Sequence, residues 1–236
     1  MSIRGLALVA APLLVLAGGA LGESRSAWPS QDMLARQFER IAFTSEYGGQ
    51  NRAGRLIRWS GPVRVRLTGH MPDRFRVEVE RQLAELRALS GLAIEIAQEG
   101  AEGLPPPMTI EFSNSRGGTT FEPDAPCRTL IWEDRYVISK VQIYIAPYPD
   151  YVRRHCIAEE VTQALGLADD SPLIRDSIYH DASARQRIAP WDALMVRVLY
   201  DPRLKPGMTK AEAMPIVRRI IAEHLSRGAT SSSRPR

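Results

Sequence analysis

One stretch of this chain, residues 154–170 with the sequence RHCIAEEVTQALGLADD, constrains the fold more than any other. On a helical wheel at about 100° per residue, it separates into an apolar side and a polar side. The apolar side holds Ile157, Ala158, Val161, Ala164 and Leu165, and the polar side holds His155, Glu159, Glu160, Thr162 and Gln163. We therefore expect a helix that packs on a core through one side and presents carboxyl, amide and imidazole groups on the other.

The polar residues of this stretch have the spacing of a metallopeptidase active-site helix. Zincins of the extended type have the pattern H-E-x-x-H-x-x-G-x-x-H/D, in which two histidines and the last residue bind the metal. Here the same positions hold Glu159, Glu160, Gln163, Gly166 and Asp169, so the spacing is complete but both histidines are absent. A site of this kind would use Glu159, Gln163 and Asp169 as metal ligands and Glu160 as the general base.

The ligand chemistry of such a site differs from that of zinc enzymes. Two carboxylates and an amide oxygen form a hard set that suits calcium, magnesium or manganese better than zinc. His155 lies one turn before Glu159, so His155, Glu159 and Asp169 form an alternative set. The sequence leaves open whether one divalent metal ion binds here, because a solvated helix face without a ligand is the competing interpretation.

Several residues after the motif are further candidates. Gly166 suits a left-handed turn at the helix end, which would return Asp169 over the polar side. Tyr179 and Tyr200 are candidates for stabilising an oxyanion, by analogy alone. His180 and Asp181 follow closely enough in the chain to fold back toward the site; the sequence does not determine their distance from it.

The periodicity of the remaining chain predicts a single α+β domain of zincin-like, metzincin type. Helical spacing appears in residues 30–44, 75–91, 191–200 and from 209 onward, and β-prone runs in residues 58–68, 92–97, 108–113, 129–133 and 136–146. These elements predict a mixed sheet of about five strands with a long helix packed on it and the motif helix after it. Strand, long helix, further strands and motif helix is the order of a zincin catalytic half.

Three segments resemble a bacterial protein family, the domain of unknown function 2927. They are EEVTQALGLADDS at residues 159–171, DSIYHD at 176–181 and LYDPRLKPGM at 199–208, and together they span about 50 residues. The resemblance implies an exported protein or lipoprotein with this architecture, and it carries no established activity. It also implies that the E-E-x-x-Q pattern is a family trait. Asp170 stands where the family is expected to have Asn.

The two ends of the chain differ from the domain between them. Residues 1–22 contain Arg4, an apolar run and small residues, features of a cleaved export signal. The run is near the lower limit for spanning a bilayer, so an uncleaved anchor is the weaker interpretation and no membrane insertion is expected after cleavage. Residues 226–236 are polar and aperiodic, which predicts a disordered tail. We expect a domain at residues 23–225 in the periplasm or outside the cell.

Cysteine usage and charge fit an exported protein. Cys127 and Cys156 are an even count and predict a disulfide, worth about 3 kcal/mol for a loop of about 30 residues. The net charge is +4, and removal of residues 1–22, with one arginine and no acid, makes it +3. The arginines are scattered without a basic, aromatic patch, so we expect no nucleic-acid partner.

Two classes of function remain open, because the chain has no G-x-S-x-G elbow, phosphate-binding glycine loop or C-x-x-C pair. The first is a metal-dependent peptidase or amide hydrolase in which Glu160 activates a water molecule. The second is a non-catalytic envelope protein that binds a peptide strand along its sheet edge or acts in assembly. The sequence leaves substrate, partner and oligomeric state undetermined.

Overall fold

The computed structural model describes residues 28–44, 54–98, 106–114 and 125–232, with side chains to residue 227. Over these ranges the chain forms five helices and five strands. In chain order they are α1 (Gln31–Phe43), β1 (Val63–Gly69), α2 (Asp73–Ser90), β2 (Ile94–Ile96), β3 (Met108–Phe112), β4 (Cys127–Asp134), β5 (Val137–Ile145), α3 (Asp150–Gln163), α4 (Pro190–Leu199) and α5 (Lys210–Ser232). The predicted export signal lies outside the described residues.

The five strands form one mixed sheet in the order β2-β1-β3-β5-β4. Four of them pair in parallel, and β4 runs antiparallel to β5 at the edge, with Cys127 opposite Ile145. The long helix α2 is the crossover that parallel pairing of β1 and β2 requires. The predicted α+β fold, with a mixed sheet, a long packing helix and a motif helix, is therefore confirmed.

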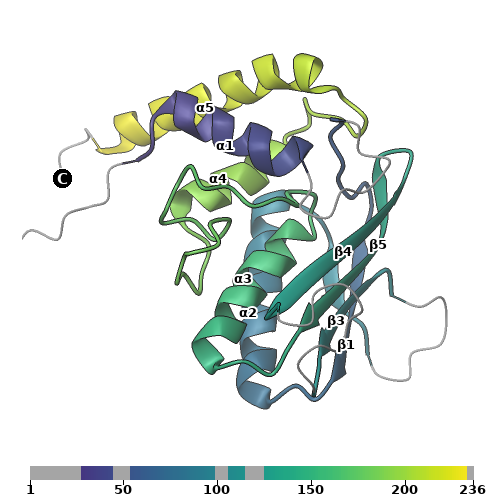
Figure 1. Cartoon of the computed structure of the whole chain (residues 1–236). Coiled ribbons are helices and arrows are strands. Elements are labelled where there is room, and N and C mark those ends of the chain that lie inside the picture. The colour runs from purple at the N-terminus through teal and green to yellow at the C-terminus, as the bar shows by residue number, and fades with distance from the viewer. Residues whose placement is uncertain (1–27, 45–53, 99–105, 115–124, 233–236) are drawn as a thin grey trace, which may run out of the picture.

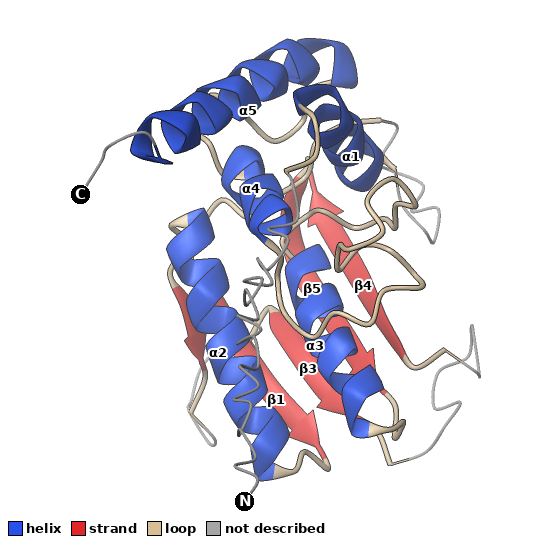
Figure 2. Ribbon diagram, turned by 90° about the vertical axis from the view of Figure 1, so that its left-hand side faces the viewer, coloured by secondary structure: helices blue, strands red, loops and turns tan. Residues whose placement is uncertain are grey.

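Helices α2 and α3 lie on the same face of the sheet (Figures 1 and 2). In β3, the buried residues Met108, Ile110 and Phe112 alternate with less buried neighbours, as in a strand with one face toward a core. The strand residues Val63, Val65, Val141, Ile143 and Ile145 are fully buried as well. The core thus lies between the sheet and these two helices.

A buried polar contact joins α2 to α3. The side-chain amide of Gln82 donates to the Ala158 carbonyl at 3.1 Å and to the Thr162 hydroxyl at 2.8 Å. The helical wheel placed Thr162 on the polar side of α3. In the structure Thr162 is fully buried and lies on the side that packs on α2. The wheel gave the wrong side because α2 offers Thr162 a polar partner inside the core.

The other three helices pack together beyond one end of the sheet (Figure 1). Helix α1 contacts both α4 and α5. A capping box begins α5: the Thr209 amide donates to the Glu212 carboxylate at 2.8 Å, and the Glu212 amide donates to the Thr209 hydroxyl at 3.3 Å. Among the described helices, none has the length and apolar character needed to cross a membrane.

The C-terminal end of α5 differs from the expectation. The helix continues to Ser232, so residues 226–232 are helical where the composition predicted a disordered tail, and residues 233–236 lie outside the described residues. Extending an existing helix adds one hydrogen bond per residue and avoids the cost of nucleation, which a composition argument does not take into account.

The end of α3 is fastened by side chains from distant parts of the chain. The Trp59 indole donates to the Ala164 carbonyl, and the Tyr200 hydroxyl donates to the Leu165 carbonyl, both at 2.9 Å. These two bonds satisfy carbonyls that the last turn of a helix leaves without partners. Gly166 then turns the chain at a φ of +117°, where an added Cβ would lie 2.3 Å from the Ile57 carbonyl oxygen.

Gly166→Ala is expected to lower the free energy of unfolding by about 3 kcal/mol, because the new methyl group adds a backbone clash to an unfavourable φ. Gly91→Ala is the matched control, since Gly91 also has a positive φ but no atom within 4 Å of an added Cβ, and it should cost about 1 kcal/mol. Urea denaturation measures both values. Equal losses would contradict the close approach at Gly166.

Candidate functional site

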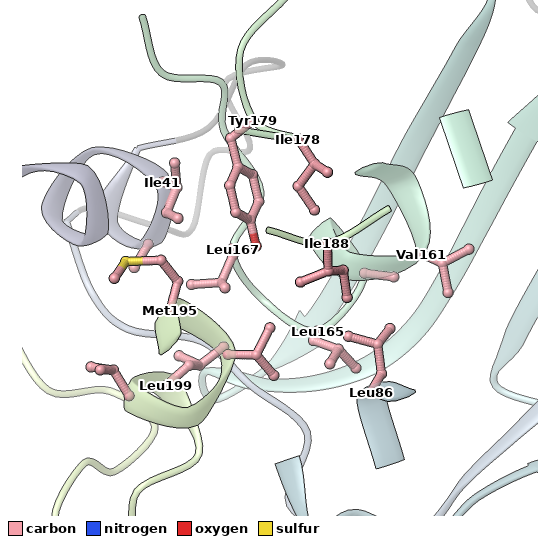
Figure 3. Close-up of a cluster of buried hydrophobic side chains, with 14 of the residues drawn as sticks. Ile41, Leu86, Val161, Leu165, Leu167, Ile178, Tyr179, Ile188, Met195 and Leu199 are labelled. Carbon is pink, nitrogen blue, oxygen red and sulfur yellow. The ribbon is translucent and has the colours of Figure 1, made fainter. Parts of the chain in front are cut away.

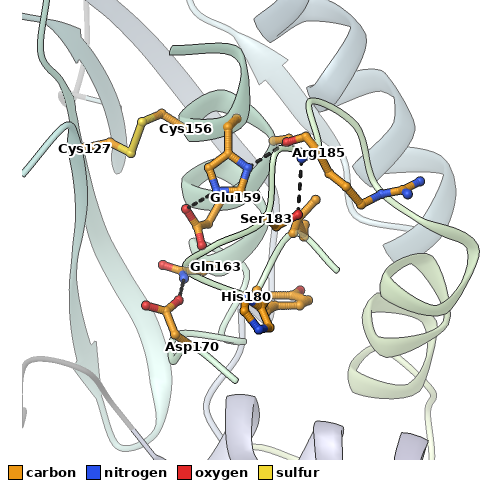
Figure 4. Close-up of polar contacts among 12 residues, drawn as sticks. Cys127, Cys156, Glu159, Gln163, Asp170, His180, Ser183 and Arg185 are labelled. Carbon is orange, nitrogen blue, oxygen red and sulfur yellow. Dashed lines mark hydrogen bonds and ion pairs between the residues drawn. A yellow bond between two sulfur atoms is a disulfide. The ribbon is translucent and has the colours of Figure 1, made fainter. Parts of the chain in front are cut away.

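Two links hold the motif helix α3 against the edge strand β4. Cys127 and Cys156 form a disulfide with their Cα atoms 5.8 Å apart, which confirms the predicted pairing (Figure 4). One turn along the helix, the Thr129 hydroxyl of β4 donates to the Glu160 carbonyl at 3.1 Å. The polar residues of the motif are thereby placed beside the sheet edge.

His155 joins α3 to a loop that lies over its polar side. Its Nδ1 is 2.6 Å from the Arg185 carbonyl oxygen, and its Nε2 is 3.2 Å from a carboxylate oxygen of Glu159 (Figure 4). Burial lowers the pKa of His155, but the contacts with Glu159 and the Arg185 carbonyl outweigh it, and the net pKa is raised. Because both ring nitrogens face acceptors, the imidazolium form is favoured.

Gln163, at the second ligand position, contacts the residue after the predicted third ligand. Its side-chain amide donates to the Asp170 carboxylate at 3.0 Å (Figure 4). The positive φ of Gly166 does return the chain toward the helix, as the sequence predicted. The residue that this turn places against Gln163 is Asp170.

Asp169 points instead toward α1. Its carboxylate accepts a hydrogen bond from the Thr44 hydroxyl and one from the Asp170 amide at 2.9 Å, and it lies 3.4 Å from the Arg40 guanidinium. The Asp169 side chain is buried, whereas Arg40 is half exposed. Asp169 therefore links the turn after α3 to the C-terminal end of α1.

The structure brings together only part of the predicted site. Among the described residues, one group of three His, Cys, Asp or Glu side chains has its ligand atoms within 4.8 Å of one another: Cys127, Glu159 and Glu160. Asp169 is outside that group, and the Cys127 sulfur is committed to the disulfide. Glu159 and Glu160 are converging carboxylates, and metal binding by them, with or without His155, stays a prediction.

Residues 170–189, which we call the covering loop, contain no helix or strand and are well anchored. The Asp192 carboxylate at the start of α4 accepts hydrogen bonds from the Ser177 hydroxyl at 2.6 Å, the Ile178 amide at 3.1 Å and the Ala189 amide at 2.9 Å. In Figure 3, Ile178, Tyr179 and Ile188 of this loop pack among residues of α1, α3 and α4. The loop is therefore part of the core and buries Glu159, Glu160 and Gln163 to 8%, 6% and 5% exposure.

The two tyrosines proposed for an oxyanion occupy structural positions. Tyr200 caps α3 and also accepts a hydrogen bond from the Trp59 amide at 3.2 Å. The Tyr179 ring is fully buried in the apolar cluster of Figure 3, and burial raises the pKa of its hydroxyl well above the usual value. Tyr179 therefore fills the apolar core, and Tyr200 binds the end of α3. A role of either residue in catalysis stays a prediction.

The remaining candidates, His180 and Asp181, lie on the covering loop. His180 accepts a hydrogen bond at Nδ1 from the Ala182 amide of the same loop at 3.0 Å, and Asp181 is exposed. Sequence reasoning missed the contacts of the motif with Arg40 of α1, with Thr44 after it and with the Arg185 carbonyl, and the role of Asp192 in anchoring the covering loop. The sequence carries one usable signal, since Asp192 follows the Ala189–Pro190 helix start as an acidic first-turn residue.

Asp169→Ala is expected to lower the free energy of unfolding by about 1 to 2 kcal/mol, because the hydrogen bonds from Thr44 and the Asp170 amide and the contact with Arg40 are lost. Asp181→Ala, an exposed acid 12 residues later in the sequence, is the control and should change stability by less than about 0.5 kcal/mol. Chemical denaturation at one pH compares them. Similar values for the two variants would show that Asp169 does not anchor α1.

Asp192 should make stability depend on pH. Burial raises the pKa of its carboxyl to about 6, although hydrogen bonds from Ser177, Ala189 and Ile178 act in the opposite direction. An unfolded Asp has a pKa of about 3.9, so the folded protein holds this proton more tightly. The contribution of Asp192 to the free energy of unfolding therefore falls as pH rises from about 4 to about 6. In Asp192→Asn, the free energy of unfolding should lack this decline between about pH 4 and about pH 6. Parallel plots of the free energy of unfolding against pH for the variant and the wild type would contradict the prediction.

Comparison with known proteins agrees with the resemblance seen in the sequence. No curated protein matches the chain. One solved structure, "Structure of myroilysin", is similar with a TM-score of 0.40 and 11% sequence identity, over 62% of this chain and 97% of that chain, a likeness too distant to support an argument about activity. A family model described as "Protein of unknown function (DUF2927)" matches residues 31–219, from α1 through α3 and the covering loop into α5. The chain belongs to the DUF2927 family.

Proposed function

We propose that this protein is a non-catalytic binding protein of the cell envelope, in which the motif helix serves as an internal clamp. One observation carries the proposal: each predicted ligand position already has a protein partner. Glu159 pairs with His155, Gln163 with Asp170, and Asp169 with Thr44 and Arg40. These contacts join α3 to the covering loop and to α1.

The energetic cost of replacing these partners supports the proposal. A buried carboxylate loses several kcal/mol of hydration, which its charged or hydrogen-bonding partner must offset. A metal ion at Glu159 would have to displace the imidazolium of His155, and one at Asp169 would have to break the contact with α1. Metal binding at these positions would therefore have to offset the loss of these contacts.

The edge strand β4 is the proposed binding surface. Within the described part of the chain, β4 pairs with β5 alone, so its outer edge is available to a further strand. Because the Ala146 amide bonds to the Pro126 carbonyl and hydrogen-bonded pairs alternate, Cys127, Thr129 and Ile131 direct their backbone groups outward. An extended peptide of an envelope protein would add here as a strand.

The bulge in β4 defines how far such a strand could extend. The register shifts between Trp132 and Glu133, so the regular ladder ends at Trp132 and Ile131 is its last outward-facing residue. Ile131→Pro removes one outward-facing amide without touching the ladder to β5 and should abolish binding of peptides selected on the wild-type protein. Ile131→Ala keeps that amide and is the control. Unchanged peptide binding by Ile131→Pro would exclude this edge.

A second function, metal-dependent amide hydrolysis, is favoured by the converging carboxylates of Glu159 and Glu160. His155 donates its Nδ1 proton to a backbone carbonyl, which is how metal-binding histidines are commonly oriented. In this mechanism a bound divalent ion would polarise the substrate carbonyl, and Glu160 would take the proton from water. Glu160→Gln would then abolish hydrolysis while leaving the fold intact.

Metal content separates the two functions. We expect purified mature protein to contain far less than one metal ion per chain by elemental analysis, and calorimetry with zinc, manganese or calcium to give no saturable binding. Glu159→Gln and the exposed Asp181→Asn should behave alike in this experiment. Stoichiometric metal that is lost in Glu159→Gln and kept in Asp181→Asn would contradict the non-catalytic proposal and favour the hydrolase.

A further inference from the structure

The first turn of α3 lies at the edge of the sheet formed by the carboxyl ends of the parallel strands, away from the edge strand β4. Helices α2 and α3 both begin at this edge. β1, β3 and β5 run toward this edge, and α2 and α3 start from it (Figure 2). Arg74 in the first turn of α2 donates to Asp150 in the first turn of α3 at 2.8 Å, so the two helix ends are in contact. In open parallel sheets, ligands bind at this kind of edge, outside the carboxyl ends of the strands.

Arg153 places a buried positive charge at this edge. Its side chain is 8% exposed, and its guanidinium carbon lies 4.2 Å from the centre of the Phe75 ring in α2 and 5.9 Å from that of Phe112 at the end of β3. Among the described residues it forms no ion pair within 4 Å, and its Nε has no hydrogen-bond partner. A guanidinium held in this way is costly unless an anion accompanies it.

The charges around Arg153 do not neutralise it. Asp150 and Arg74 are the charged groups that act on it most. These two already pair with each other, with a second hydrogen bond at 3.1 Å. Arg154, the next residue, lies 3.8 Å from Glu78 and is paired as well. Asp73, an exposed carboxylate in the first turn of α2, lies at the same edge. Among the arginines named here, Arg153 is the one without an ion pair within 4 Å in the described residues.

Both helix ends add donors to this charge. α2 and α3 follow Pro72 and Pro149, and neither N-terminus has a side-chain cap. The first amides of a helix have no intrahelical partner and carry the positive end of the helix dipole. Helices of 18 and 14 residues thus direct uncapped amides to the same edge.

We propose that this edge binds a phosphate-type oxyanion, with Arg153 as its charged contact and the first-turn amides of α2 and α3 as hydrogen-bond donors. Helix N-termini and arginine are the groups that recognise such anions elsewhere. The proposal is independent of metal or peptide binding, because Arg153 and His155 are two residues apart and face different sides of α3. The oxyanion would be free phosphate or a phosphate group on a larger molecule.

Titration with inorganic phosphate at constant ionic strength, followed by amide NMR shifts, tests the proposal. We expect saturable shifts of Asp73, Arg74, Asp150 and Tyr151 and none with sodium acetate. Arg153→Met keeps the packing on Phe75 and should weaken phosphate binding on the order of tenfold or more, the loss expected for a hydrogen bond to a charged group. Arg154→Met is the matched control and should retain affinity within about threefold.

Three outcomes would overturn the proposal. The first is the absence of saturable shifts in the wild-type protein, which needs no variant. The second is an equal loss in Arg153→Met and Arg154→Met, which would indicate a general effect of net charge. The third is an equal response to acetate. If phosphate binds as expected, a soluble phosphomonoester compared with vesicles containing a phosphate-headgroup lipid distinguishes the sources.

Discussion

Helix α3 is buried on every side along its second half, and this burial constrains the rest of the structure. Every residue from Cys156 to Gln163 is buried, including two glutamates, a threonine and a glutamine. Buried polar groups must find hydrogen-bond partners, and these come from four directions. Gln82 of α2 binds the Thr162 hydroxyl, His155 contacts Glu159, and Asp170 of the covering loop accepts from Gln163. Thr129 of β4 donates to the Glu160 backbone carbonyl.

This constraint changes the meaning of the motif. In an open cleft, Glu159 and Gln163 at adjacent turns would offer oxygen atoms to a metal ion. Here the same spacing aligns them with His155 and Asp170, so that each forms a contact across the helix surface. The i, i+4 spacing that suits metal ligands also suits a row of internal pairs. We infer that in this chain the motif serves these internal contacts, with the covering loop accepting the hydrogen bond from Gln163.

The sequence predicted the fold well because its signals are local. The β-prone run at residues 108–113, the left-handed turn at Gly166 and the even cysteine count each correspond to an observed feature. The candidate site was less predictable, because the partners of its side chains come from residues far away in the sequence. Asp169 meets Thr44 across 125 positions, and no periodicity reveals such a contact. The buried side of Thr162 could not be derived for the same reason.

The most direct test of the clamp is a crystal structure of the mature protein grown with excess zinc, with data collected at the zinc absorption edge. We expect an anomalous difference map with no peak within bonding distance of Glu159, Glu160 or Gln163, and we expect His155 still to bridge Glu159 and the Arg185 carbonyl. A peak bound by Glu159 together with His155 or Glu160, with the covering loop displaced, would contradict it.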